Sequence, residues 1–282
     1  IFSINIIIFI NFNRISNIYN LFDYPDELRK NHKKPTSLFG GLVILINLIL
    51  YCCLEYFGFI ELSFFPEKNQ IIIFLFFSCL YFLIGFIDDK YSLKPNTKLF
   101  FYILLIIALV FFDKDILIKN INFSFSSYIF DFKSFSIFFT VLCFLLFINS
   151  FNMLDGINGQ AASYSVYISL VFLFLEINLI FFSILIISLL FFLYNNFKNK
   201  MFLGDSGTIL LGFVISYFFI KSYNMGFKIY SDEIFLIMMI PGFELVRLAT
   251  QRLYKKRHPF SPDTNHIHHL MIRKNGFIKS FI

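Results

Sequence analysis

The chain has 282 residues, of which 58% are hydrophobic and only 15% are charged, and its mean hydropathy is +0.74. This balance excludes an ordinary soluble globular domain, so the lipid bilayer is the expected solvent. The net charge of +6 does not indicate nucleic-acid binding, because the basic residues are not interleaved with aromatic residues in a soluble domain. Basic loops instead orient a membrane protein and attract anionic lipid headgroups.

Apolar runs divide the chain into a series of expected transmembrane helices. A helix needs about 20 mostly apolar residues to cross the roughly 30 Å of hydrocarbon in a bilayer. The expected spans are 1–13, 39–59, 71–87, 99–112, 135–151, 160–176, 178–194, 207–222 and 233–251. The expected fold class is therefore all-α, a polytopic integral membrane helix bundle that forms one domain over residues 1–282. Since Ile1 already lies in an apolar run, we expect the chain to be a fragment at one or both ends.

The distribution of Lys and Arg predicts which loops face the cytoplasm. With these spans, the segments 14–38, 88–98, 149–159, 195–206 and 247–282 share one side of the membrane. They carry 18 of the 24 basic residues, so the positive-inside rule makes this side cytoplasmic. The polar clusters of the sequence lie in the same five segments. This co-location predicts a single site assembled at the cytoplasmic face.

The first cluster, Arg29 to Lys34, follows the first expected span and includes His32. Charge runs of this kind usually face solvent or lipid headgroups and serve as topology anchors. Phosphate binding is the additional role that we consider for Arg29 and His32.

Asp88 and Asp89 end the apolar run 71–87. Adjacent carboxylates at a helix end are costly unless a cation neutralises them. One interpretation is a helix stop at the membrane interface, followed by Lys90. The other is a magnesium site, since Mg²⁺ prefers carboxylate oxygens and substrate phosphates.

The segment 149–160 places Asn152, Asp155, Asn158 and two glycines after an apolar helix. The glycines permit backbone conformations that let a ligand approach closely. A tight turn between two helices favours the same residue types. For this loop taken alone, both interpretations stay open.

Asp205 lies within Gly204-Asp-Ser-Gly207, at the start of a long apolar helix. Its ordinary role there is to cap the helix N-terminus. The same end of a helix attracts phosphate, because its free amides and its dipole favour an anion. Asp205 is therefore expected either to cap the helix or to hold a metal ion that bridges a diphosphate.

The segment 252–276 is expected to be a His-rich cytoplasmic loop, because four of the five histidines lie in it. Three of them, His266, His268 and His269, fall within four positions. A zinc site is one alternative, but no cysteine accompanies the histidines and their spacing is not common for zinc. Contact with a phosphate or a nucleotide, together with Arg257, is the preferred interpretation.

Taken together, these segments resemble the polyprenyl-phosphate N-acetylhexosamine-1-phosphate transferases (glycosyltransferase family 4). The resemblance runs from about Asp23 to Gly276. It rests on Asp23-x-Pro-Asp-x-x-Arg-Lys-x-His with Gly40-Gly41, Asp88-Asp-x-x-x-Leu with Lys98-Leu99, Asn152-Met-x-Asp-Gly-x-Asn-Gly, Phe202-x-Gly-Asp-Ser-Gly, and Pro259-Phe-x-Pro-Asp-x-x-His-Ile-His-His. Each motif alone is weak or moderate evidence, whereas five in order on one expected membrane face are strong. The last motif is similar to the branch that uses UDP-GlcNAc and related N-acetylhexosamines.

The resemblance implies transfer of an N-acetylhexosamine-1-phosphate, such as GlcNAc-1-phosphate, from a UDP-N-acetylhexosamine to undecaprenyl phosphate. UMP would leave, and the product would start cell-envelope polysaccharide synthesis. The implied location is the bacterial cytoplasmic (inner) membrane, with the active site on the cytoplasmic face. The implied cofactor is Mg²⁺, with Mn²⁺ as an alternative. Expected partners are the two substrates and membrane lipids, with no nucleic acid, and a homodimer is considered.

The resemblance also assigns roles to individual residues. The implied catalytic residues are Asp88, Asp89, Asp155 and Asp205, and the implied metal ligands are Asp205, Asp88, Asp89 and Asn152. The implied substrate-binding residues are Lys98, Asn152, Asn158, Arg257, His266, His268, His269, Arg29 and His32.

Two departures from the family pattern keep alternatives open. The position of Asn158 is often Asp in relatives and that of Gln160 is often Leu, which is compatible with a catalytically impaired member. A membrane transporter is the other alternative. It predicts ionisable residues near span midpoints and on both faces, whereas the acidic pairs here lie at span ends on one face.

Overall fold

The computed structural model describes residues 2–19, 21–24, 35–60, 64–227 and 229–256, and this part of the chain is mostly helical, as predicted. Its first half contains α1 (Phe2–Tyr19), β1 (Phe22–Asp23), β2 (Thr36–Ser37), α2 (Gly40–Tyr56), α3 (Lys68–Tyr91), α4 (Pro95–Phe112), η1 (Lys114–Ile116), β3 (Asn120–Phe123) and β4 (Ser126–Asp131). Its second half contains η2 (Lys133–Phe135), α5 (Ser136–Leu154), α6 (Gln160–Phe174), α7 (Leu179–Asn196), α8 (Gly204–Asn224), α9 (Ser231–Ile237) and α10 (Met239–Tyr254).

Five of the described helices are long and apolar enough to cross a bilayer, namely α3, α4, α5 with the preceding η2 turn, α7 and α8. Two further apolar helices, α2 and α6, are shorter. The first eight predicted spans each coincide with one helix, from α1 to α8. The chain is therefore a multi-pass membrane protein.

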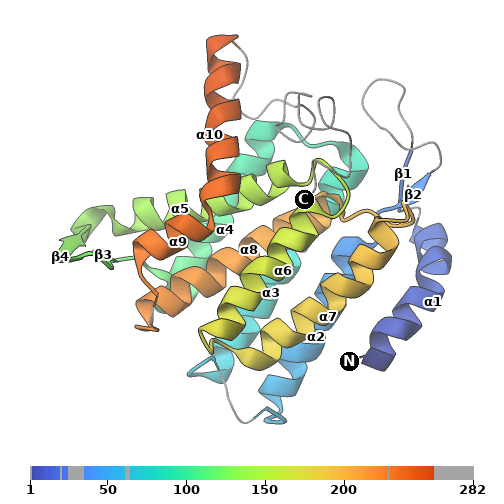
Figure 1. Ribbon diagram of the computed structural model, residues 1–282, viewed down its shortest axis with the longest axis horizontal. Coiled ribbons are helices and arrows are strands. Elements are labelled where there is room, and N and C mark those ends of the chain that lie inside the picture. The colour runs from blue at the N-terminus through green and yellow to red at the C-terminus, as the bar shows by residue number, and fades with distance from the viewer. Residues whose placement is uncertain (1, 20, 25–34, 61–63, 228, 257–282) are drawn as a thin grey trace.

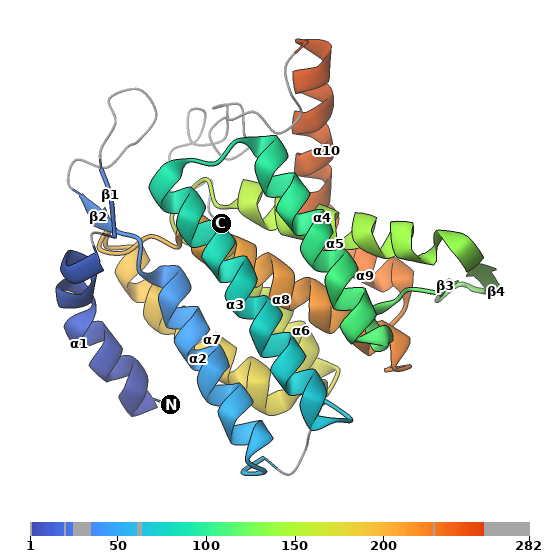
Figure 2. The ribbon, with the colours of Figure 1, turned by 180° about the vertical axis from the view of Figure 1, so that it is seen from behind.

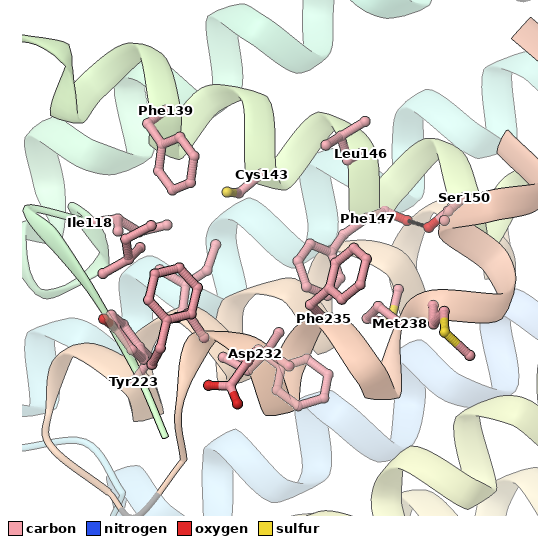
Figure 3. Close-up of a pocket in the computed structure, with 18 of the residues that line it drawn as sticks. Ile118, Phe139, Cys143, Leu146, Phe147, Ser150, Tyr223, Asp232, Phe235 and Met238 are labelled. Carbon is pink, nitrogen blue, oxygen red and sulfur yellow. Dashed lines mark hydrogen bonds between the residues drawn. The ribbon is translucent and has the colours of Figure 1, made fainter. Parts of the chain in front are cut away.

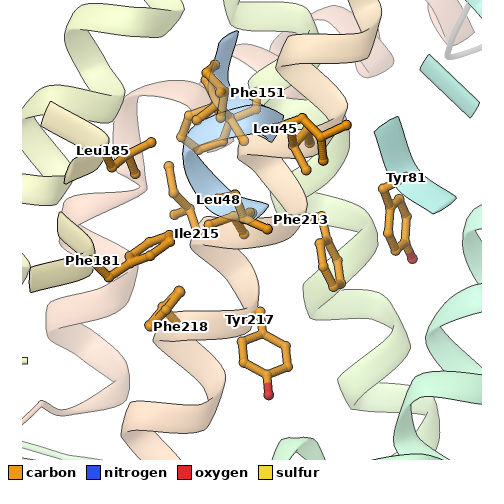
Figure 4. Packing of buried hydrophobic residues seen from close by; sticks show 14 of the residues in the cluster. Leu45, Leu48, Tyr81, Phe151, Phe181, Leu185, Phe213, Ile215, Tyr217 and Phe218 are labelled. Atoms are coloured by element: carbon orange, nitrogen blue, oxygen red, sulfur yellow. The ribbon is translucent and has the colours of Figure 1, made fainter. Parts of the chain in front are cut away.

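Helix α8 is the centre of the bundle, where α2, α3, α5 and α6 pack around it (Figure 1). Nearly every residue of α8 from Ser206 to Ser222 is buried. Its aromatic residues form the core, and the rings of Tyr81 in α3 and Phe213 in α8 stack with centroids 4.4 Å apart (Figure 4). A helix that is apolar on all sides is stable only when it is surrounded in this way.

Glycines let two helices approach the first turn of α8 closely. A Cβ atom on Gly85 of α3 would lie 2.4 Å from the Cα of Ser206. A Cβ atom on Gly41 of α2 would lie 2.6 Å from the backbone nitrogen of Gly207. Small residues at such crossings allow backbones to approach each other in a bilayer. The beginning of α8 is thereby fixed against the end of α3 and the beginning of α2.

The ninth predicted span, 233–251, is wrong as a single helix, because the structure breaks it at Met238 into α9 and α10. Pro241 explains the break: it has no amide hydrogen for the carbonyl of Ile237, and its ring opposes a continuous helix. The hydroxyl of Tyr164 in α6 donates to that carbonyl instead. Helix α10 then projects away from the bundle (Figures 1 and 2).

Two short antiparallel ribbons, which an all-α prediction does not include, mark the two ends of the bundle. At one end, β1 pairs with β2, and Ser37 of β2 bridges to Met201 just before α8. At the other end, β3 and β4 form a hairpin between α4 and α5. We call the end with β1 and β2 the motif end; α3 and α5 finish there and α8 begins. We call the end with β3 and β4 the hairpin end; α4 and α8 finish there and α5 begins.

Candidate active site

Four helices bring the predicted acidic and polar residues together at the motif end. Asp88 and Asp89 lie in the last turn of α3, and Lys98 lies in the first turn of α4. Asn152 lies near the end of α5 and Asp205 near the start of α8. The predicted assembly of the described motifs is therefore confirmed in space, although the residues come from distant parts of the sequence.

Asp89 caps helix α8 from the neighbouring helix α3. Its Oδ1 accepts from the backbone amide of Asp205 at 2.8 Å, and its Oδ2 accepts from that of Ser206 at 3.1 Å. Gly204 has a φ of +73°, and a Cβ atom there would lie 2.8 Å from Asp89 Oδ2. Glycine is needed here because it adopts this conformation without a side chain that would displace the carboxylate. Asp89 thus satisfies amides that otherwise lack partners at a helix start.

Asp88 points to a different partner and is buried. Its Oδ1 accepts from the backbone amide of Leu93 at 2.7 Å, and its Oδ2 forms an ion pair with Lys98. The Nζ of Lys98 also lies 3.7 Å from Oδ2 of Asp205. Because the carboxyl group of Asp88 lies against that of Asp205, the two acids and the lysine form one cluster.

Asn152 completes this cluster together with a residue that the sequence did not single out. Its Nδ2 donates to Oδ1 of Asp205 at 2.8 Å and lies 3.2 Å from Oγ1 of Thr208. Thr208 is one helical turn after Asp205, so it faces the same side of α8. The sequence signal for Thr208 was the spacing Asp205-x-x-Thr208, which places both side chains on one side of α8. This spacing indicates a shared site only when Asn152 of α5 is known to lie opposite that side of α8.

Asp155 and Asn158 lie in the turn between α5 and α6 and differ in their surroundings. Asp155 is the exposed residue that ends α5. The neighbouring protein, by desolvation, and then the charges of Asp205 and Asp89 raise the pKa of Asp155 to about 7. Asn158 donates to the carbonyl of Asn196 at 3.2 Å and to Oδ1 of Asn199 at 2.6 Å. Its contacts therefore tie this turn to the α7–α8 loop and do not reach the carboxylate cluster.

The side chains of the cluster are of the kinds that Mg²⁺ binds in proteins. Among the residues described, no group of three or more His, Cys, Asp and Glu side chains can hold a metal ion. Mg²⁺, however, is typically held by one or two carboxylates and by substrate phosphates. Asp88 and Asp205 supply two carboxylates side by side, and Asn152 and Thr208 add polar groups. This donor set fits Mg²⁺ together with a bound diphosphate.

The remaining predicted site residues lie outside the described residues. These are Arg29, His32, Arg257, His266, His268 and His269.

An apolar cavity of about 490 Å³ runs along α5 (Figure 3). Phe139, Cys143, Leu146 and Ser150 follow one another on this helix and line the cavity. Helices α8, α9 and α10 and the β3–β4 hairpin supply the other walls. Ser150 lies about one turn before the end of α5, so the cavity extends along α5 from the hairpin end toward the motif end. The residues of the carboxylate cluster are not among those that line it.

Comparison with known proteins agrees with this arrangement. Residues 71–223 match the family described as glycosyl transferase family 4. The chain is 30% identical over 263 residues to an undecaprenyl-phosphate alpha-N-acetylglucosaminyl 1-phosphate transferase of Thermotoga maritima, covering 92% of this chain and 76% of the relative.

Relatives of the same name in other bacteria match over similar lengths. The protein from Escherichia coli K12 is 26% identical over 274 residues, covering 92% of this chain and 71% of its own length. That from Salmonella typhimurium is 24% identical over 268 residues, covering 90% and 69%. The matched residues include Asp88, Asn152 and Asp205 of the cluster and Asp89, which caps α8. The chain belongs to glycosyl transferase family 4.

Proposed function

We propose that the protein transfers GlcNAc-1-phosphate from UDP-GlcNAc to undecaprenyl phosphate and releases UMP. The observation that carries the proposal is the Asp88–Lys98–Asp205 cluster, which lies at one end of a membrane bundle that also holds an apolar cavity along α5. The relatives are named for sugar-1-phosphate transfer to this lipid. UDP-GlcNAc is soluble in water and undecaprenyl phosphate lies in the membrane. A protein that joins them therefore needs a polar site and an apolar site in one membrane bundle.

The chemistry asks the protein for alignment and charge neutralisation more than for covalent participation. An oxygen of the lipid phosphate attacks the sugar-bound phosphorus, the bond from this phosphorus to the bridging oxygen breaks, and UMP departs with the electron pair. Mg²⁺ supplies positive charge to the diphosphate when it is bound. Asp88 and Asp205 would hold this ion, and Asn152 keeps Asp205 in place through its 2.8 Å hydrogen bond.

Lys98 and Asp155 have supporting roles in this proposal. Lys98 neutralises the paired acids and presents its ammonium group to phosphate. The second pKa of a phosphate is about 6, so the lipid phosphate is already largely deprotonated at neutral pH. Asp155, in the turn between α5 and α6, would contact the donor. The cluster would face the cytoplasm, in agreement with the basic residues of the segments at the motif end.

The apolar cavity is the proposed site for the first part of the prenyl chain. Its volume lies within the range of about 300–1,000 Å³ that is usual for ligand pockets. Its walls are apolar almost throughout, with Ser150 at the motif end. The chain would extend along α5 from the phosphate at the cluster.

The test is release of UMP by purified protein with UDP-GlcNAc, undecaprenyl phosphate and Mg²⁺. We expect Asp205→Asn to lower kcat by roughly 100-fold or more, because it removes a carboxylate that would hold Mg²⁺ against the diphosphate. Asp131→Asn is the matched control, since Asp131 is exposed on the distant hairpin. Product with only another UDP-N-acetylhexosamine would change the donor, and no product with every donor would contradict the proposal.

A further inference from the structure

The β3–β4 hairpin covers the end of the apolar cavity that lies farthest from the carboxylate cluster. Ile121, Phe123 and Phe125 of the hairpin line the cavity together with Asp232 of α9. Every residue of β4 is exposed, and Phe125 has an exposed fraction of 79%. The hairpin therefore has little packing of its own against the bundle.

Hydrogen bonds hold the hairpin to α8 and α9. The backbone amide and the hydroxyl of Ser124, at the tip, donate to the two carboxylate oxygens of Asp232 at 2.8 and 2.5 Å. The hydroxyl of Ser231 donates to the carbonyl of Asn122 at 2.5 Å. The amide of Asn122 in turn donates to the hydroxyl of Tyr223 at 2.7 Å.

Asp232 is the charged member of this network. A carboxylate beside an apolar cavity is costly unless hydrogen bonds satisfy its oxygens, and Ser124 satisfies both of them. These bonds hold the pKa of Asp232 below its usual value. Asp232 is therefore charged at neutral pH, and both of its carboxylate oxygens are bound by Ser124.

We propose that the β3–β4 hairpin is a clasp that closes over a long prenyl chain, and that Asp232 is the positioning residue that holds the clasp shut. The inference rests on the proposed function, because it assigns the acceptor lipid to the cavity. Phe139 and Ser150 lie eleven residues apart on α5, which corresponds to about 16 Å of helix. Undecaprenyl phosphate is long enough to pass under the clasp, whereas the chain of citronellyl phosphate ends before it.

The kinetic test compares the two acceptors in the same protein. We expect Asp232→Ala to raise KM for undecaprenyl phosphate roughly threefold to tenfold, since two hydrogen bonds to a charged group are lost. The kcat and the KM for citronellyl phosphate should stay unchanged. Asp232→Asn should have a smaller effect, because its amide oxygen still accepts from Ser124. Asp131→Ala is the matched control, because Asp131 lies in the same hairpin and accepts from the amide of Lys133 there.

A binding test that needs no turnover uses Cys143, a free cysteine in the cavity wall. We expect undecaprenyl phosphate to protect Cys143 from alkylation by N-ethylmaleimide, measured by mass spectrometry, and Asp232→Ala to weaken this protection. Cys53, which is exposed on α2, is the internal control.

The outcomes separate the clasp from the proposed function. Turnover with an unchanged KM for undecaprenyl phosphate in Asp232→Ala would overturn the clasp and leave the function intact. A rise in KM for both acceptors, or a fall in kcat alone, would also overturn it. If no acceptor is turned over, the proposed function fails, and the Cys143 measurement alone decides about the clasp. Weaker protection in Asp232→Ala than in the wild type supports the clasp, and equal protection overturns it.

Discussion

Asp88 and Asp89 are neighbours in the sequence with different partners in the structure. Successive residues on an α-helix point about 100° apart, so the two carboxylates cannot face the same group. Asp88 turns to Lys98 and Asp205, while Asp89 turns to the backbone amides that begin α8. The pair therefore consists of one acid of the carboxylate cluster and one cap that positions Asp205.

Asp89→Asn tests this division at the scale of one residue. We expect the free energy of unfolding to fall by about 1–2 kcal/mol, because one amide of α8 loses its acceptor and the helix dipole loses a negative charge. The kcat should also fall, since Asp205 shifts with the first turn. Thermal unfolding in detergent and UMP release measure the two effects.

Asp205→Asn is the comparison for this variant. It should lower kcat strongly and leave the unfolding temperature close to that of the wild type. An Asp89→Asn protein with wild-type stability would show that the cap is dispensable and that our assignment is wrong.

At the scale of elements, the junction of α9 and α10 depends on two residues that are far apart in sequence. Pro241 leaves the carbonyl of Ile237 without its helical partner, and Tyr164 of α6 donates to it. This bond holds the end of α9 against α6, and the break at Met238 redirects α10. Since α9 and α10 both line the apolar cavity, this bond also shapes the cavity wall.

A double-mutant cycle measures that coupling. We expect Tyr164→Phe to destabilise the protein by about 1–2 kcal/mol, because it leaves a partly buried carbonyl without a donor. In a Pro241→Ala background the same change should cost less, since the alanine restores an amide hydrogen for the carbonyl of Ile237. Unfolding temperatures of the four proteins provide the measurement. Equal costs in both backgrounds would mean that Tyr164 and Pro241 act independently.

At the scale of the whole molecule, α8 connects two polar centres of different character. The motif end carries the carboxylate cluster. The hairpin end carries a fully buried ion pair, in which Lys221 Nζ lies 3.0 Å from Asp113 Oδ2 and the hydroxyl of Tyr217 donates to the same oxygen at 2.7 Å. Asp205 and Lys221 are sixteen residues apart, which is about 24 Å along the helix. The distant pair anchors α8 against the end of α4.

Lys221→Met should therefore affect stability and not catalysis. We expect the free energy of unfolding to fall by about 3–5 kcal/mol, because Asp113 is left as a buried charge without its cation. The kcat of the folded protein should stay near the wild-type value. Lys221→Met combined with Asp113→Asn should regain part of the loss. A fall in kcat without a loss of stability would contradict this separation.

The sequence predicted much of this molecule. Runs of apolar residues predicted eight of the helices, because a bilayer requires a long apolar segment wherever the chain crosses it. The motif order and the distribution of basic residues predicted that Asp88, Asn152 and Asp205 would meet at one end, and they do. The prediction of the ninth span was wrong because it relied on the apolar content of residues 233–251 and not on the helix-breaking effect of Pro241. The carbonyl that Pro241 leaves without a helical partner is bound by Tyr164, a contact that the sequence does not show.

By itself, then, the sequence determined the membrane location, the helices up to α8 and the identity of the acidic residues, since these follow from local composition and spacing. Only the tertiary structure decided that Asp89 caps α8, that Lys98 pairs with Asp88, that Thr208 joins the cluster and that Asp232 holds the β3–β4 hairpin. Each of these contacts joins residues from different elements. Their formation depends on the direction of side chains across a helix crossing, and a linear pattern does not contain that direction.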